Sequence, residues 1–89
     1  TVPIEQRISV VEGLAQLPPS VSVPLLLKAA RDPSSAVRSQ AAEVAAELPI
    51  VDGKPAGHPV LRLLSDDGNA VIRARASALL LRLLKVPAH

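Results

Sequence analysis

Apolar residues recur at helical spacing in five segments of the chain. Positions three, four, seven and eight residues apart lie on one face of a helix. The pattern predicts helices at about 3–17, 22–31, 34–48, 59–65 and 69–85. No stretch alternates with period two, so we expect no sheet. The inward-facing positions would be Ile4, Ile8, Val11, Leu14 and Leu17 in the first helix, Val37, Ala41, Val44, Ala45 and Leu48 in the third, and Ile72, Ala76, Leu79, Leu80 and Leu83 in the fifth.

Capping residues and prolines mark the ends of these helices. Thr1 and Ser22 are expected to cap the first two helices. Pro24 then falls in the first turn of the second helix, where a proline is tolerated. The cap expected for the third helix is Asp32 or Ser34, and the fifth helix is expected to begin at Asn69 or Ala70. The stops are Pro18-Pro19, Pro49 and Pro87.

The chain repeats itself at two offsets. A shift of 35 residues superposes Pro24, Leu26, Asp32, Arg38, Ala41 and Leu48 on Pro59, Leu61, Asp67, Arg73, Ala76 and Leu83. A shift of 31 superposes Arg7, Glu12, Ala15, Leu17 and Pro18 on Arg38, Glu43, Ala46, Leu48 and Pro49. The four extra residues fall in segment 49–58, whose Asp52-Gly53 pair indicates an exposed and mobile loop. The sequence is therefore expected to open partway through a repeat.

The repeated pattern resembles HEAT repeats, which are close relatives of armadillo repeats. An apolar helix ends in Asp, a short turn follows, and a Val-Arg pair then precedes Ala by three residues. The pattern is present as Leu25-Leu26-Leu27, Asp32, Val37-Arg38 and Ala41, and again as Leu61, Leu63-Leu64, Asp67, Ile72-Arg73 and Ala76. The opening segment departs from it, because Gln6 stands where Val would precede Arg7.

The resemblance implies an all-α fold, a right-handed α-solenoid fragment of about five antiparallel helices. Residues 1–89 would form one segment, with a half repeat at 3–17 and repeats at 22–48 and 58–85, as part of a longer solenoid. The first helix of each pair would lie on the convex face and the second on the concave face. Stacking is also expected on physical grounds, because one helix pair cannot bury its own apolar stripe. A compact five-helix bundle is the alternative.

The resemblance also implies a structural role for four charged residues. Asp32, Arg38, Asp67 and Arg73 would form a ladder of hydrogen bonds between neighbouring repeats. The competing interpretation is phosphate binding, because the guanidinium group of arginine presents a rigid fork of donors.

Polar side chains on the second helices are expected to face a groove. The candidates for binding a partner are Gln40, Glu43, Glu47, Arg75 and Arg82, and Ser9, Glu12, Gln16 and Ala78 occupy similar turns. The sign of the charge changes along this groove. Glu43 and Glu47 are a like-charge pair one turn apart, which costs a few tenths of a kcal/mol and favours a cation supplied by a partner. A solvated surface is the competing interpretation.

The last two turns of the fifth helix are apolar on every side. If Leu79, Leu80 and Leu83 face inward, Leu81 and Leu84 lie on the opposite side. A helix with this pattern is typically buried on two sides. We therefore expect Leu81 and Leu84 to contact a further repeat or a second copy of the chain.

The composition offers no catalytic chemistry. Cysteine is absent, which excludes thiol nucleophiles and cysteine-ligated metals. His58 and His89 lack a second ligand at metal-binding spacing. The Gly53-Lys54 pair lacks the order of a phosphate-binding loop, and none of the serines has an identifiable base. We expect no catalytic residue, cofactor or metal.

These observations favour a protein-binding module. We expect a non-catalytic protein–protein interaction scaffold that holds a peptide, a helix or a neighbouring domain within a larger assembly, inside the cell in the cytoplasm or nucleus. The alternative is a solenoid that grips the nucleic-acid backbone, but a net charge of +2 and the absence of aromatic side chains weigh against it. No apolar run approaches the roughly 18 residues of a membrane span.

Overall fold

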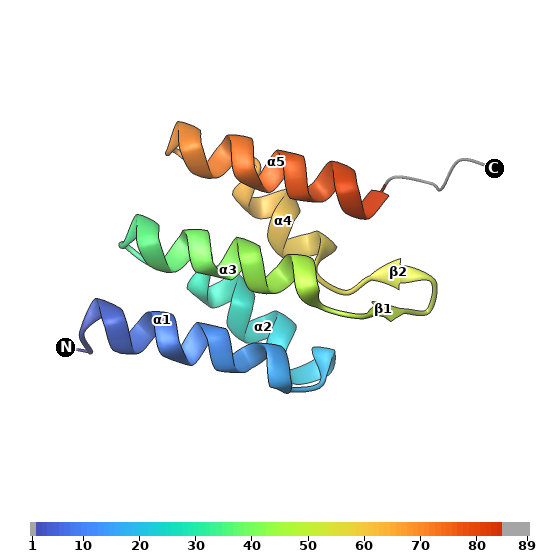
Figure 1. The fold of residues 1–89 in the computed structure, drawn as a ribbon, viewed down its shortest axis with the longest axis horizontal. Coiled ribbons are helices and arrows are strands. Elements are labelled where there is room, and N and C mark those ends of the chain that lie inside the picture. The colour runs from blue at the N-terminus through green and yellow to red at the C-terminus, as the bar shows by residue number, and fades with distance from the viewer. Residues whose placement is uncertain (1, 85–89) are drawn as a thin grey trace.

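Five α-helices form two layers in the computed structural model, which describes residues 2–84 (Figure 1). The front layer contains α1 (Ile4–Gly13), α3 (Ser35–Glu47) and α5 (Ala70–Leu84), which lie side by side and run in the same direction. Behind them lie α2 (Pro19–Ala29), packed against α3, and α4 (His58–Leu64), packed against α5. The result is a flat stack of 49 × 29 × 15 Å.

The third helix connects the two ends of this stack. It packs against α1, α2, α4 and α5, whereas α1 and α5 lie on opposite sides of it (Figure 1). Contacts between successive repeats that bury one continuous core along the stack are typical of a solenoid. The expected all-α solenoid fragment is therefore confirmed, and the compact bundle does not describe the structure.

The core between the layers consists of small aliphatic side chains. All five positions expected to face inward on α3 and its C-terminal end are buried, and so are Ile72, Ala76 and Leu79 on α5. Leu80 and Leu83 are half-buried. Alanines on the packed faces allow neighbouring helices to approach closely, because interaxial distance depends on the side chains at the contact.

The first helix is less buried than its apolar pattern predicts. Val11 and Leu14 are buried and Ile8 is half-buried, but Ile4 and Leu17 are exposed. The reason is the position of α1 at the end of the stack, where it packs on α3 in the front layer and has no helix on its other side in the described part of the chain (Figure 1).

The start of α2 differs from the sequence-based expectation. The helix begins at Pro19, with Pro18 at the cap position, and Ser22 lies inside it instead of capping it. A proline in the first helical position loses no hydrogen bond, since that N–H has no partner inside a helix. Pro24 consequently falls in the second turn and not in the first.

Side-chain oxygens accept backbone hydrogen bonds at the starts of α3 and α5, but only the second is an N-cap bond. Asp32 accepts a hydrogen bond of 2.8 Å from the backbone N–H of Ser34, whose own side chain makes no capping bond. Asn69 accepts bonds from the N–H groups of Val71 and Ile72, as an N-cap does. The α-helical part of the first segment ends at Gly13 and continues as a 3₁₀ turn, η1 (Leu14–Gln16). The expected positions at Thr1, Lys85 and Pro87 lie outside the described residues.

The expectation of no sheet is wrong at one place. β1 (Ile50–Val51) pairs antiparallel with β2 (Lys54–Pro55) in a two-residue hairpin. Asp52 and Gly53 form the turn with φ of 53° and 77°, and positive φ at both central residues is the type I′ pattern that joins short hairpins. The hairpin contains the four inserted residues and is exposed, apart from its last residue.

Replacing Ser22 by alanine is expected to stabilise the chain. Its hydroxyl is fully buried, and no hydrogen-bond partner is found for it among the described residues. Burial of an unsatisfied polar group costs about 1–3 kcal/mol, and alanine is the better helix former. Urea unfolding followed by circular dichroism should show a gain of about 0.5–2 kcal/mol. Ser20→Ala, at an exposed position of the same helix, is the control, and a less stable Ser22→Ala variant would contradict the assignment.

Candidate functional site

Arginine–aspartate pairs join consecutive repeats at the turns between the two layers. Arg38 donates hydrogen bonds of 2.8 and 3.3 Å from Nε and Nη2 to the two carboxylate oxygens of Asp67 in the next repeat. Arg7 pairs in the same way with Asp32 of the next repeat. Its Nη2 donates a hydrogen bond of 3.2 Å to the carboxylate, and its Nε lies 3.0 Å from Oδ1. The sequence-based set did not include Arg7, although the shift of 31 residues places it over Arg38.

Arg38 and Arg73 hold the turns of their own repeats, and among the described residues Arg73 shows no bond to another repeat. Arg38 Nη1 donates to the carbonyl oxygens of Asp32 and Pro33, and Arg73 Nη1 donates to those of Asp67 and Gly68. All three nitrogens of the Arg38 guanidinium group therefore bond within the chain. This leaves Arg38 poorly placed to bind a phosphate.

The carboxylate of Asp67 is expected to make the free energy of unfolding depend on pH. Burial raises the pKa of Asp67, but hydrogen bonds from the Asn69 N–H and from Arg38 outweigh burial, so the pKa lies below its usual value. A lowered pKa in the folded state contributes stability that is present above the unfolded-state pKa, about 3.9 for Asp, and is lost as pH falls through the folded-state value.

Asp67→Asn is therefore expected to lower the free energy of unfolding at pH 7 and to reduce its decline between about pH 5 and pH 3. Urea unfolding across this pH range measures both effects. The double variant Arg38→Ala/Asp67→Asn supplies the control, because two residues of one ion pair show non-additive losses. An unchanged pH dependence in Asp67→Asn would contradict the role given to this carboxylate.

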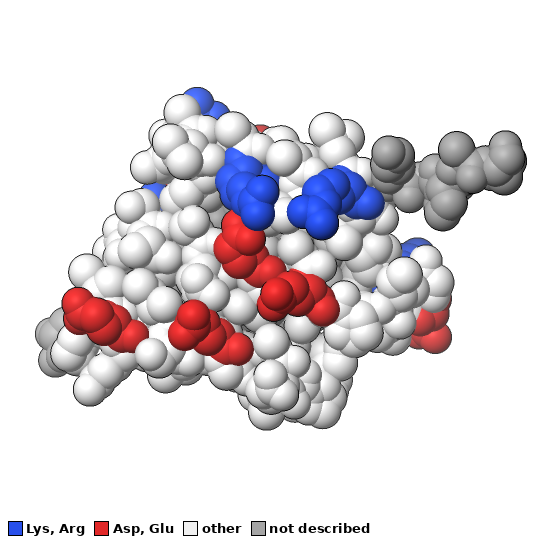
Figure 2. Space-filling model, viewed as in Figure 1, with Lys and Arg blue, Asp and Glu red and all other residues white. Residues whose placement is uncertain are grey.

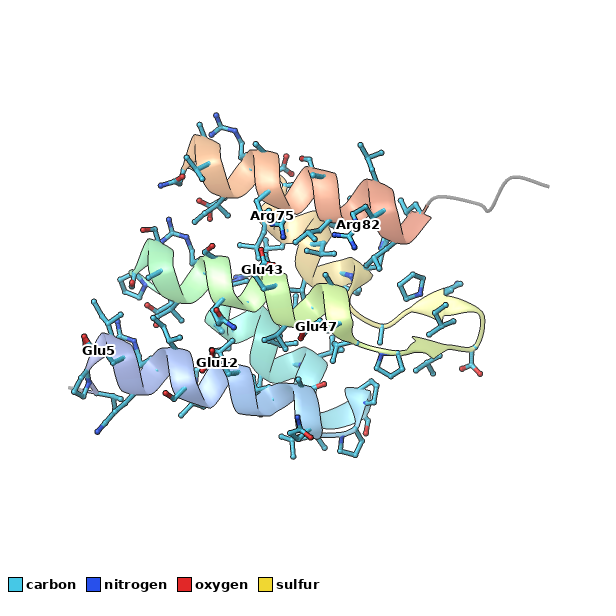
Figure 3. All side chains as sticks on the ribbon, viewed as in Figure 1. Glu5, Glu12, Glu43, Glu47, Arg75 and Arg82 are labelled. Atoms are coloured by element: carbon cyan, nitrogen blue, oxygen red, sulfur yellow. The ribbon has the colours of Figure 1, made fainter. Side chains whose placement is uncertain are left out.

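A groove of about 280 Å³ lies between α3 and α5. We call it the α3–α5 groove. Its lining consists of Glu43, Ala46, Glu47, Arg75, Leu79, Arg82 and Leu83. Its apolar residues are buried or half-buried. Its charged groups are carboxylates on α3 and guanidinium groups on α5 (Figure 3).

One ion pair closes one end of the α3–α5 groove. Arg75 donates two hydrogen bonds to Glu43, of 2.7 Å from Nε and 3.0 Å from Nη2. The hydrogen bond from Arg75 lowers the pKa of Glu43, while partial burial opposes this effect. Both side chains remain more than one-third exposed, and exposed ion pairs contribute little to stability. The cation that the sequence led us to expect from a partner is thus supplied to Glu43 by the chain itself.

Glu47 and Arg82 occupy the other end of the groove. They lie on opposite sides of it, one from α3 and one from α5 (Figure 3). Within residues 2–84, neither side chain forms an ion pair. Gln40, the fifth candidate, is half-buried on α3 and does not line the groove.

The whole front layer carries charges of opposite sign at its two ends. Acidic side chains lie over α1 and α3, and basic side chains lie over α5 (Figure 2). Glu5 and Glu12 on α1 extend the acidic part beyond Glu43 and Glu47 (Figure 3). The change of sign expected from the sequence is therefore present on one continuous face.

Apolar side chains are also exposed at the two ends of the stack. Leu81 is 70% exposed at the end of α5, and Leu84 is also exposed. A cleft of about 330 Å³ lies between α1 and α2, at the other end of the stack. The sequence pattern did not point to this cleft, because its exposed residue Val10 falls outside the stripe expected to face inward.

Metal-binding and membrane features were also sought in the described residues. Within 2–84, no three His, Cys, Asp or Glu side chains come together as a metal site would require. Among the same residues, none of the helices has the length and apolar character needed to cross a bilayer.

Comparison with protein families gives a match to HEAT repeats. The family model covers residues 3–81, which include the segments 3–17 and 22–48 and most of 58–85. No curated protein and no solved structure matches the chain.

Proposed function

Because the chain belongs to the HEAT-repeat family, whose members are commonly non-catalytic protein-interaction scaffolds, we propose that it binds a segment of a partner protein in the α3–α5 groove. The observation that carries this proposal is the arrangement of Glu47 and Arg82 across the groove, without an ion pair to either in the described residues. We propose that the protein acts inside the cell and has no catalytic role of its own.

The groove defines the chemistry of the segment that would bind. A basic residue of the partner would meet Glu47, an acidic residue would meet Arg82, and an apolar side chain would cover Leu79 and Leu83 between them. Complementary charges of this kind favour specificity and fast association more than affinity. A segment with both signs of charge and one apolar anchor is therefore the expected ligand.

Selection of peptides from a displayed random library tests this proposal. We expect the selected peptides to contain both charges around an apolar residue and to lose affinity for Glu47→Lys and for Arg82→Glu, about tenfold or more for each. Arg62→Glu, at an exposed position of α4 in the back layer, is the matched control and should bind as the wild type does.

Two results would contradict the groove as the binding site. One is a set of peptides whose affinity is the same for the wild type and for both charge reversals. The other is tight binding of duplex DNA in preference to peptide. The logarithm of the DNA affinity would then fall with the logarithm of the salt concentration with a slope steeper than about −4, which corresponds to contacts with more than four phosphates. The front layer offers mainly Arg75 and Arg82 for such contacts, next to four carboxylates (Figure 3).

We also propose that Leu81 and Leu84 mediate self-association or contact with a neighbouring domain, because both are exposed on the last turns of α5. Light scattering at increasing concentration should show association of the wild type. The Leu81→Glu/Leu84→Lys variant should stay monomeric. A wild type that remains monomeric at millimolar concentration would contradict self-association.

A further inference from the structure

The boundary between α1 and α3 can be compared with the boundary between α3 and α5, because the two are related by the internal repeat. A shift of 31 residues places Glu12 over Glu43, and a shift of 35 places Gln40 over Arg75. α1 packs on α3 as α3 packs on α5, and the three helices lie side by side (Figure 1). Each contact across one boundary therefore has an equivalent position at the other.

The comparison shows that one cation is missing between α1 and α3. Between α3 and α5, Arg75 donates two hydrogen bonds to Glu43. Between α1 and α3, the equivalent of Arg75 is Gln40, which carries no charge. Glu12 is exposed and forms no ion pair within residues 2–84. The carboxylate that is paired at one boundary is thus unpaired at the other.

The unpaired charges follow a fixed order across the front layer. Glu12 lies on α1, Glu47 lies on α3 and lines the α3–α5 groove, and Arg82 lies on α5 across that groove (Figure 3). None of the three forms an ion pair in the described part of the chain. From α1 to α5, the unpaired charges are therefore negative, negative and positive.

The spacing of the helices defines the length of a segment that would meet all three charges. Packed helices lie about 8–10 Å apart, and an extended chain advances about 3.3 Å per residue. About three residues of an extended segment therefore lead from one front helix to the next. A complementary segment would carry two basic residues about three positions apart and an acidic residue about three positions further on.

We infer that Glu12 forms a second subsite for a basic side chain of the partner segment, which crosses α1, α3 and α5 with its basic end on α1 and its acidic end on α5. The inference rests on the function proposed for the α3–α5 groove and adds the extent and the polarity of the bound segment. The partner's basic side chain takes at Glu12 the place that Arg75 takes at Glu43. Complementary charges of this kind favour specificity.

Two designed peptides test the subsite by NMR titration at up to millimolar concentration. One has the sequence Lys-Ser-Ser-Lys-Leu-Ser-Asp, and the other has serine in place of the first lysine. Both are also made in reversed order, because the charges determine which end lies on which helix but not the direction of the backbone. The peptide with two lysines should bind about two- to fivefold more tightly, the gain expected from one exposed ion pair.

Gln40→Arg is the most direct variant, because it gives Glu12 the internal cation that Glu43 already has. The two peptides should bind this variant with equal affinity. Glu12→Gln should give the same result, and its exposed position leaves the fold undisturbed. Glu5→Gln is the matched control: it removes the same charge from an exposed position of the same helix and should leave the difference between the peptides unchanged.

A spin label at one end of the two-lysine peptide tests its polarity. A label at the lysine end should broaden the NMR signals of Ser9 and Glu12 on α1. A label at the aspartate end should broaden those of Ala78 and Arg82 on α5. The opposite pattern would overturn the inferred orientation.

The results distinguish failure of this inference from failure of the function proposed for the groove. If Glu47→Lys and Arg82→Glu weaken binding but the difference between the peptides persists in Glu12→Gln and Gln40→Arg, the groove is supported and the subsite at Glu12 is overturned. Sensitivity to Glu12→Gln with none to Arg82→Glu would overturn the polarity, since basic residues alone would then be recognised. The absence of any shift on α3 and α5 at millimolar peptide would overturn the groove and, with it, the subsite.

Discussion

Gly57→Ala is expected to destabilise the chain by about 3 kcal/mol or more, beyond the 1–3 kcal/mol typical of overpacked sites. An added Cβ would overlap the carbonyl oxygen of Ala45 and lie 2.5 Å from its carbonyl carbon. These are backbone atoms of α3 at a fully buried position, so they cannot rotate away as a side chain could. The backbone angle of Gly57 is ordinary, with φ of −81°, and the loss would come from the collision alone.

Gly13→Ala is the matched control for this prediction. Gly13 lies at the end of α1 with a helical φ of −66°, and an added Cβ there meets no atom within 4 Å. Alanine should stabilise this position by about 0.5–1 kcal/mol. Urea unfolding followed by circular dichroism measures both variants. Similar stability of the two variants would mean that α4 does not approach the α3 backbone as closely as described.

Leu61→Ala is expected to lower the free energy of unfolding by about 2–5 kcal/mol, as truncation of a fully buried leucine does. Leu61 is one of the largest side chains that α4 buries completely. Loss of its side chain would remove apolar contacts and leave a cavity between the layers. The same substitution at Leu81, which is exposed, should change stability by no more than about 0.5 kcal/mol.

The comparison of these two leucines tests which side of each helix faces the core. Unfolding in urea would give equal losses if α4 and α5 were packed differently from the structure. A larger loss of stability from Leu81→Ala than from Leu61→Ala would mean that the buried and exposed sides of these helices are the opposite of those in the structure.

Helical periodicity predicted the interior of the chain better than its ends. On α3 every residue expected to face inward is buried, because α3 has neighbours on both sides and in the back layer. In the segment formed by α1 and η1, the same reasoning placed Ile4 and Leu17 in the core, and both are exposed. The pattern shows which side of a helix is apolar, but burial also depends on which helices lie beside it.

Close contacts between helices could not be predicted from the pattern. Gly57 and Ser22 correspond to each other at the shift of 35 residues, and both are buried where the back layer meets the front layer. The sequence suggested a loop glycine and a helix cap at these positions. Their burial follows from the distance between packed helices, which depends on all the side chains in the contact.

The candidate groove was predicted in part. The repeat offsets placed Glu43, Glu47, Arg75 and Arg82 on one face, since they put the acidic and basic residues on neighbouring second helices. The pairing of Glu43 with Arg75, and the absence of an ion pair at Glu47 and Arg82 in the described residues, depend on how far α3 and α5 are shifted along each other. The shift depends on how the side chains of both helices pack together, so the sequence of either helix alone could not predict it.

Site-specific crosslinking tests the α3–α5 groove most directly. The chain contains no cysteine, so a single introduced cysteine can carry a photoreactive group without competing sites. Ala78 is exposed on α5 and shares a helix face with Arg75 and Arg82, whereas Arg62 is exposed on α4 in the back layer. With a library-selected peptide bound, labelled Ala78→Cys should crosslink to it and labelled Arg62→Cys should not. Crosslinks from Arg62→Cys alone, or equal yields from both positions, would contradict binding in the groove.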